Sequence, residues 1–296
     1  MPEHLPPSPV APPRWIRQGV ARDDAETALF AAGAALAVLD PAARSEHPAG
    51  MVWRRRLALM AAVATSALDG RRAGEAQLRD HWALRRPGDD PGPDGRMLEG
   101  WRLLGLRPAD WPSRLPGCFD LPPEPVADLL RGLGARLAGR ALPLRTAAEA
   151  ANEIRALGPP CRGLALWVGD AVLARALGWA RPVPLIAAHL PRAAFRLTGE
   201  DWLTACAGAW ARGAVAAFDL HGDLVRRAEA LRLAAPKLRG KDAQAAVAAL
   251  MAEDAIPAQA GARTSDRAAR RLFERLTGLG LVRELTGRAT FRLYGL

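Results

Sequence analysis

Apolar residues recur every three or four positions along most of the chain, the spacing that places them on one face of an α-helix. Alanine and leucine also outnumber the β-branched residues, so intrinsic propensity favours helices. We therefore predict a mainly α protein. The predicted helices span residues 23–39, 51–68, 74–84, 125–137, 146–157, 164–177, 185–190, 200–220 and 222–233, with a further helix that begins at Met97.

Prolines and glycines predict the breaks between these helices. Pro41 should stop the first helix at Asp40, because the residue before a proline avoids helical geometry. The Gly and Pro content of residues 86–96 predicts a loop without regular structure. Residues 109–125 read as a second proline-rich connection, which Trp111 pins to the core.

Residues 264–296 follow a different pattern, which predicts a helix, a turn and a β-hairpin. Thr264, Ser265 and Asp266 can cap the helix, and Gly278 and Gly280 can end it. Its apolar face carries Ala268, Ala269, Leu272, Phe273 and Leu276. Its opposite face carries Arg267, Arg270, Arg271, Glu274 and Arg275.

Two short strands, 281–285 and 289–294, should follow this helix around a turn at 286–288. In the second strand Phe291 and Leu293 alternate with polar neighbours, as a half-buried strand requires. A helix followed by a short hairpin is typical of the second half of a winged helix-turn-helix.

A first helix for that winged helix is predicted over 241–254, with Val247, Leu250 and Met251 toward the core. Only 257–264 is left for the second helix, and Gly261 interrupts it, so we expect a single turn there. The hairpin turn is short, so contact with phosphate is expected rather than deep insertion into a minor groove.

A break at Pro236 and Gly240 predicts the domain boundary. Residues 1–20 are interpreted as a flexible proline-rich arm, 21–235 as one all-helical domain, and 238–296 as a winged helix domain. No internal repeat of solenoid period is visible.

Charge is concentrated in the last part of the chain. The whole chain has a formal charge of +10, and residues 231–296 hold 12 basic against 6 acidic side chains. This asymmetry predicts that the C-terminal domain binds double-stranded DNA, with Arg267, Arg270 and Arg271 in the major groove and Arg288 on the backbone. The predicted DNA-binding residues are Lys241, Arg263, Arg267, Arg270, Arg271, Arg275 and Arg288.

Candidate chemistry is sparse. The phosphate-binding loop, zincin and hydrolase-elbow motifs are missing from the sequence, and its five histidines are scattered. Cys118, Cys161 and Cys206 lack a neighbouring ligand at metal spacing. We expect no catalytic residue, metal or cofactor. The apolar runs are short and flanked by charge, so we also expect no membrane segment and a cytoplasmic protein.

Three stretches resemble the bacterial family called domain of unknown function 1403, along most of the chain. They are LFAAGAALAVLD from Leu29, GDDPGPDGR from Gly88, and SDRAARRLFERL with VRELTGRATFRLYGL from Ser265 onward. The family's name implies no function.

A more remote resemblance is to Fic-domain proteins. ATSALDGRRAGEAQL from Ala64 is similar to their inhibitory helix, in which Thr65, Asp69 and Gly70 match the motif, with Asp for the usual Glu. GWARPVPLIAAHL from Gly178 resembles the stretch after their catalytic helix, and many Fic proteins end in a winged helix. The catalytic loop is absent: residues 154–163, IRALGPPCRG, stand in its place without a histidine. The resemblance therefore implies a degenerate, inactive Fic-like domain.

Three functional classes compete. A DNA-binding regulator or accessory factor explains the localised charge and the arginine face. A protein-interaction module, either an accessory subunit of a larger complex or a homodimer, explains the lost catalytic loop and the Trp-rich helical domain. A nucleotidyl-transferring enzyme explains neither. We rank the three classes in that order.

Overall fold

The computed structural model of the chain describes residues 11–17, 24–86, 88–106, 111, 114–121, 132, 142–238, 243–258, 266–286 and 291–296. Within these residues the chain is mainly helical, as predicted. The α-helices are α1 Arg14–Arg17, α2 Ala25–Arg44, α3 Ala49–Leu68, α4 Glu75–Leu84, α5 Gly92–Leu104, α7 Pro143–Arg155, α8 Arg162–Ala176, α9 Gly199–Ala234, α10 Ala243–Ala252 and α11 Asp266–Gly278. The short 3₁₀ helices are η2 Pro116–Cys118, η3 Pro159–Cys161, η4 Arg192–Arg196 and η5 Ala235–Lys237, and the strands are β1 Ile256–Pro257, β2 Arg283–Glu284 and β3 Leu293–Gly295.

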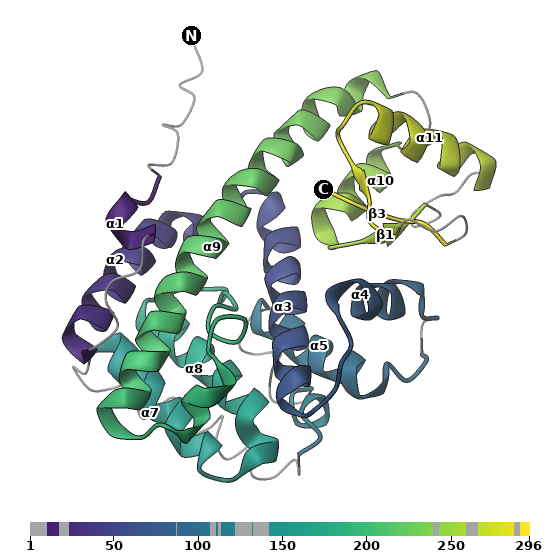
Figure 1. Cartoon of the computed structure of the whole chain (residues 1–296). Coiled ribbons are helices and arrows are strands. Elements are labelled where there is room, and N and C mark those ends of the chain that lie inside the picture. The colour runs from purple at the N-terminus through teal and green to yellow at the C-terminus, as the bar shows by residue number, and fades with distance from the viewer. Residues whose placement is uncertain are drawn as a thin grey trace.

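The helical part is built around α9, which is 36 residues long. Figure 1 shows α9 running from the lower body of helices up to the C-terminal region, with α2 along one side and α3 on the other. The prediction of two helices separated at residues 220–222 is wrong, because α9 continues through Gly222. Ala217 and Leu224 are fully buried on either side of it. Their burial offsets the cost of about 1 kcal/mol for a glycine inside a helix.

The predicted stop of α2 at Asp40 is also wrong, since the helix continues through Pro41 to Arg44. A proline inside a helix costs about 3 kcal/mol. Leu39 is fully buried just before the proline, and Arg44 donates a hydrogen bond to the carbonyl oxygen of Leu177 at 2.6 Å. These tertiary contacts hold the last turn in helical form.

α2 is long and apolar enough to cross a bilayer by length and composition alone, and it is the one such helix among the described residues. It packs along α9, and Ala32, Ala35 and Leu36 are buried there. Burial of this kind is typical of a helix packed against the body of a folded protein.

Residues 14–17, inside the predicted N-terminal arm, form α1 and pack on the helical body. Ile16 is buried, and Trp15 stacks on Phe30 with ring centroids 5.6 Å apart. Arg17 forms a bidentate salt bridge with Asp219 on α9, with hydrogen bonds of 2.6 and 2.7 Å.

Two predicted segments differ from the structure in the middle of the chain. α5 begins at Gly92, within the predicted loop, and not at Met97. Pro93 fits this first turn because a helix leaves its first N–H groups unpaired. The helix predicted over 125–137 lies outside the described residues, apart from Gly132.

The predicted helix at 185–190 is instead an irregular loop held by Asp170. The fully buried carboxylate of Asp170 accepts hydrogen bonds from the backbone N–H of Leu185 at 2.7 Å and from the indole of Trp210 at 2.8 Å. Burial raises the pKa of Asp170 to about 7, although these donors favour its charged form. Gly213 lets the loop approach α9, because a Cβ there would lie 2.3 Å from the carbonyl oxygen of Leu185.

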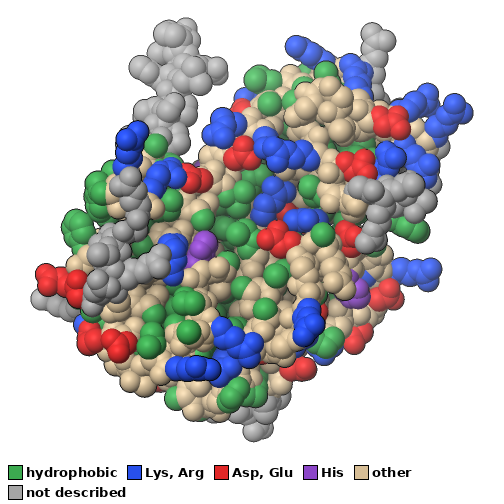
Figure 2. All heavy atoms as spheres, viewed as in Figure 1, with side chains coloured by type: hydrophobic (Ala, Val, Ile, Leu, Met, Phe, Trp, Pro, Cys, Tyr) green, Lys and Arg blue, Asp and Glu red, His purple; other side chains and the backbone are tan. Residues whose placement is uncertain are grey.

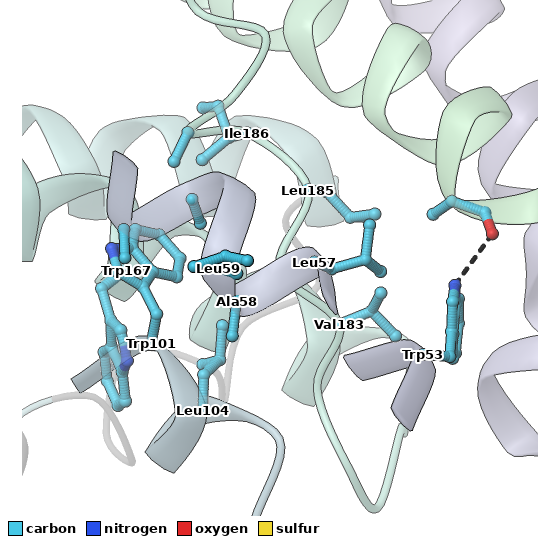
Figure 3. Packing of buried hydrophobic residues seen from close by; sticks show 14 of the residues in the cluster. Trp53, Leu57, Ala58, Leu59, Trp101, Leu104, Trp167, Val183, Leu185 and Ile186 are labelled. Atoms are coloured by element: carbon cyan, nitrogen blue, oxygen red, sulfur yellow. Dashed lines mark hydrogen bonds between the residues drawn. The ribbon is translucent and has the colours of Figure 1, made fainter. Parts of the chain in front are cut away.

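Tryptophans fill the core of the helical region. Figure 3 shows Trp101 and Trp167 beside Leu59, and Trp53 at the other end of the core with its indole N–H bonded to the carbonyl oxygen of Ala217 at 2.9 Å. Other indoles also donate: Trp101 to Thr65, Trp111 to Leu103, Trp167 to Gly100, Trp179 to Asp40 and Trp202 to Ala148. The predicted anchoring role of Trp111 is confirmed.

The C-terminal region contains α10, α11 and an antiparallel sheet of order β1-β3-β2 (Figure 1). In the central strand β3, Tyr294 pairs with Ile256 of β1 and with Glu284 of β2. Phe273 of α11 stacks on Tyr294, with ring centroids 4.6 Å apart. α11 is thereby packed on the sheet.

The predicted hairpin is wrong in detail. Both strands are shorter than expected, and the connection between them is longer. Phe291 lies outside the strand, is 73% exposed and has a φ of 57°. Leu293 and Tyr294 are both buried, because the central strand is covered on both faces. The predicted alternation requires one open face, which β3 does not have.

The C-terminal region is fastened to the helical region by Asp254, which follows α10. Its carboxylate accepts from Arg56 of α3 at 2.6 Å and from Arg79 of α4 at 2.7 Å. Arg56 also donates to the carbonyl oxygen of Leu296 at 3.2 Å. Gly295 allows this approach, because a Cβ there would meet the Asp254 carbonyl oxygen at 2.6 Å.

The neighbouring Glu253 makes a second set of contacts at the same junction. Its carboxylate pairs with Arg55 of α3 and with Arg102 of α5. Figure 2 shows basic and acidic side chains next to one another along the seam between the C-terminal region and the helices below it. We call Arg55, Arg56, Arg79 and Arg102 the junction arginines.

Candidate nucleic-acid interface

α11 has one buried face and one exposed, basic face. Ala269, Phe273 and Leu276 are at most 4% exposed, and their spacing of four and three residues puts them on one side of the helix. The opposite side is open to solvent. It carries four exposed side chains, here called the α11 arginines: Arg267, Arg270, Arg271 and Arg275.

The fold places this basic face outward. Figure 1 shows α11 on the outer side of the C-terminal region, away from the helical body. In the same view, Figure 2 shows Lys and Arg side chains gathered along that outer edge. A long, rigid partner could therefore approach α11 without meeting the helical body.

The charges of the α11 arginines are not neutralised by the described part of the chain. No ion pair within that part joins them to an acid. Their side chains make one hydrogen bond within the described residues, and it is local, from Arg271 Nε to the carbonyl oxygen of Arg267 at 3.4 Å. Glu274 is the one described acidic side chain on the helix. The face therefore keeps a positive potential that a polyanion would relieve.

Exposed arginines elsewhere do find partners. Arg145 pairs with Glu200 at 2.6 Å, and Arg114 pairs with Glu99 at 2.7 Å. Other exposed arginines, such as Arg192 and Arg196, have no ion pair among the described residues. What sets α11 apart is that it gathers four such arginines on a helix of 13 residues.

The remaining predicted DNA-binding residues are Lys241, Arg263 and Arg288, and all three lie outside the described residues. So do the predicted capping residues Thr264 and Ser265. The described part of the interface consists of the α11 arginines.

The inhibitory-motif-like residues have structural roles at the end of α3. Thr65 is fully buried, donates to the carbonyl oxygen of Ala61 at 2.8 Å and accepts from the Trp101 indole at 3.0 Å. Asp69 pairs with Arg71 at 2.9 Å. Gly70 has a φ of 83°, a conformation that suits glycine at a helix end.

Residues 154–163, which the sequence analysis compared with a Fic catalytic loop, also make structural contacts. Arg155 donates to the carbonyl oxygens of Phe195 at 3.0 Å and Leu197 at 2.6 Å. Its guanidinium lies 4.0 Å from the ring centroid of Trp202. Cys161 is buried, and burial raises the pKa of its thiol. These contacts tie α7 to the loop before α9.

The described histidines differ in their surroundings. His47 contacts Glu229 at 3.0 Å, while burial lowers the pKa of His189 and, to about 4, that of His221. His4 lies outside the described residues. Within the described chain, no group of His, Cys, Asp and Glu side chains is placed to hold a metal ion.

The sequence analysis missed the junction arginines. A run of three arginines, Arg54 to Arg56, inside an otherwise apolar helix was the available signal. Arg55 pairs with Glu253 and Arg56 pairs with Asp254, and 198 positions separate the residues of each pair. Spacing along the chain could not predict these pairs.

Comparison with known proteins identifies a family. No curated protein matches the sequence. The family described as "Protein of unknown function (DUF1403)" matches residues 7–296, which confirms the resemblance seen in three stretches of the sequence. The chain belongs to this DUF1403 family.

Proposed function

We propose that the protein binds double-stranded DNA through the α11 arginines and acts as a transcriptional regulator or an accessory factor. One observation carries the proposal: four exposed arginines share one face of α11 and have no acidic partner among the described residues. Arginine offers a planar fork of donors that can clamp a phosphate or read guanine.

The order of elements supports this reading. α10, β1, α11, β2 and β3 follow one another as in winged helix-turn-helix domains, and the sheet order β1-β3-β2 is also theirs. In such domains the helix before the hairpin is the one that enters the major groove. The second helix of the motif would fall at residues 259–265, outside the described residues.

The proposed docking uses the N-terminal half of α11. Arg267, Arg270 and Arg271 enter the major groove, where each can clamp a phosphate or read a base edge, and Arg275 lies one turn further on. Arg288, in the connection between β2 and β3, contacts the phosphate backbone. Phosphate contacts set the position of the protein on the duplex, whereas base contacts supply sequence preference.

For the helical region we propose a degenerate relation to Fic-domain proteins, without catalysis. The order of the similar stretches along the chain supports this relation. Labelled nucleotide transferred to the protein or to a host protein, and lost on mutation within residues 154–163, would contradict the inactivity.

The DNA-binding proposal is tested by a gel-shift titration with the full chain and a mixed-sequence duplex. The variant Arg270→Ala with Arg271→Ala should bind more weakly by about 1 to 3 kcal/mol for each lost contact. The control is Arg192→Ala with Arg196→Ala, which removes two exposed arginines from η4 in the helical region. It should bind as the wild type does.

Two outcomes would contradict the proposal. One is equal affinity of the wild type and the α11 variant, and the other is no binding to any duplex at low salt. Either result would favour the protein-interaction alternative, in which the same basic face meets an acidic protein surface.

A further inference from the structure

A second arginine-rich feature is a cavity of about 500 Å³ at the junction of the helical and C-terminal regions. Its walls come from α3, α4, α5 and residues 253–257. Its charged lining consists of Arg54, Arg55, Arg85, Arg102, Arg114, Glu99 and Glu253. Five arginines against two glutamates give the lining a formal excess of three positive charges.

The two glutamates do not neutralise the whole lining. Glu253 is shared by Arg55 and Arg102, and Glu99 pairs with Arg114 at 2.7 Å. Both acids are therefore engaged with three of the arginines. The other two, Arg54 and Arg85, have no carboxylate partner among the described residues.

Arg85 is positioned by a contact with Trp82, but one of its hydrogen-bond donors has no partner in the described chain. Its guanidinium lies 3.9 Å from the ring centroid of Trp82, close enough for a cation–π contact. Its Nε is buried and finds no hydrogen-bond partner in the described chain. That nitrogen is covered by protein atoms, so the Arg85 side chain keeps one costly unpaired donor. The side chain lines the cavity, and no described carboxylate neutralises its charge.

Arg54 brings a second charge to the same wall. It is 4% exposed, and its guanidinium donates to four backbone carbonyl oxygens, those of Ala43, Gly50, Arg181 and Pro182. Burial lowers its pKa to about 10, so it stays charged at neutral pH. Carbonyl dipoles orient this charge without cancelling it, which leaves attraction for an anion.

The rest of the lining is apolar. Met51, Leu103 and Leu106 face the cavity beside Trp82, and Ala255 to Pro257 close it from the C-terminal side. A volume of about 500 Å³ is within the range of small-molecule sites, which combine apolar walls with a few oriented polar groups.

We propose that this cavity binds a small organic anion whose phosphate or carboxylate group is held by Arg85. The buried charge of Arg54 adds attraction through space, and the apolar part of the anion lies against Met51 and Leu103. Such a ligand touches both regions of the protein and strengthens their junction. The site is separate from the α11 arginines and does not depend on DNA binding.

The test is a calorimetric titration of the full chain with inorganic pyrophosphate and, in a second arm, with citrate, at constant ionic strength. We expect saturable binding of at least one probe, accompanied by a rise in Tm. Arg85→Gln should weaken that binding by roughly tenfold, as expected when one charge-assisted contact is lost. Binding of pyrophosphate alone indicates a phosphate ligand, and binding of citrate alone indicates a carboxylate.

Two controls keep the result specific. Arg270→Ala with Arg271→Ala should leave probe binding unchanged, which separates the cavity from the α11 arginines. Arg85→Lys keeps a charge but loses the fork, and it should bind with intermediate affinity; it serves if Arg85→Gln fails to fold. The absence of saturable binding for both probes would overturn the proposal, and so would unaltered affinity in folded Arg85 variants.

Discussion

The junction arginines and the α11 arginines have the same chemistry in opposite surroundings. Arg56 and Arg79 share the carboxylate of Asp254, whose side chain is 10% exposed. Arg270 and Arg271 are exposed on α11, and no described acid pairs with them. The first set satisfies its charge within the fold, whereas the second leaves its charge for a partner. Pairing and burial, rather than residue type, separate structural arginines from candidate binding arginines.

The largest expected effect comes from removing Asp254. Asp254→Ala removes the buried carboxylate shared by the partly buried Arg56 and Arg79, and Arg79 keeps only a 3.6 Å contact with Glu75. Breaking a buried ion pair costs about 3 to 5 kcal/mol. Urea unfolding of the variant measures this loss. The control Asp219→Ala removes the partner of Arg17, in a pair whose side chains are 38% and 48% exposed, and should cost less than about 1 kcal/mol. Equal losses of stability in Asp254→Ala and Asp219→Ala would contradict the distinction between arginines paired inside the fold and arginines exposed on its surface.

A smaller effect is expected at Thr65, at the end of α3. Thr65→Val removes the hydroxyl that accepts from the Trp101 indole and should lower the free energy of unfolding by about 1 to 3 kcal/mol, because a buried donor is left unpaired. Thr204→Val is the matched control, since its hydroxyl is exposed and donates to a carbonyl four residues back. If Thr65→Val loses no more free energy of unfolding than Thr204→Val, the hydrogen bond between Thr65 and Trp101 does not stabilise the core.

Acid should destabilise the fold through His221. Burial lowers the pKa of His221 to about 4 from 6.5, so the unfolded chain takes up this proton first as the pH falls. The stability that the fold gains by keeping His221 neutral is fully present above pH 6.5 and is lost as the pH falls toward 4. Asp170, with its raised pKa, acts in the opposite direction.

The measurement that isolates His221 compares wild type with His221→Gln by urea unfolding at about pH 7.5 and about pH 5. Asp170 contributes equally to both proteins. The variant should lose less of its free energy of unfolding between the two pH values. Identical pH dependence would contradict the assigned titration.

The smallest expected effect on stability belongs to the α11 arginines. Arg270→Ala with Arg271→Ala should change the free energy of unfolding by no more than about 0.5 kcal/mol for each residue, because no described acid pairs with either side chain and Arg271 loses only a long, exposed hydrogen bond of 3.4 Å to Arg267. Thermal unfolding in the absence of DNA checks this. A loss as large as that of Asp254→Ala would place these arginines in the fold rather than at a binding surface.

Local pattern predicted much of the fold. α3, α4 and α8 fall close to the predicted ranges, and the two faces of α11 follow directly from its strong amphipathic spacing. Errors occurred where a local stop signal was outweighed by burial: Pro41 and Gly222 both lie within helices. Such outcomes depend on contacts with distant residues, which a local pattern does not contain.

The candidate sites also differ in how far the sequence could predict them. The exposed face of α11 could be predicted because all its residues belong to one helix. The cavity and the junction could not, since Arg54, Arg85 and Glu253 are brought together by three separate parts of the chain. The central position of β3, which buries both its faces, likewise depends on β1, a strand far from it in sequence.

The salt dependence of DNA binding tests the central claim most directly. Fluorescence anisotropy with one labelled duplex, repeated across a series of salt concentrations, gives the slope of log K against log salt for each protein. Each arginine that neutralises a phosphate adds about 0.9 to the magnitude of that slope. We predict a negative slope for the wild type, reduced in magnitude by up to about two in Arg270→Ala with Arg271→Ala. The same slope and affinity for both proteins would contradict DNA binding through α11.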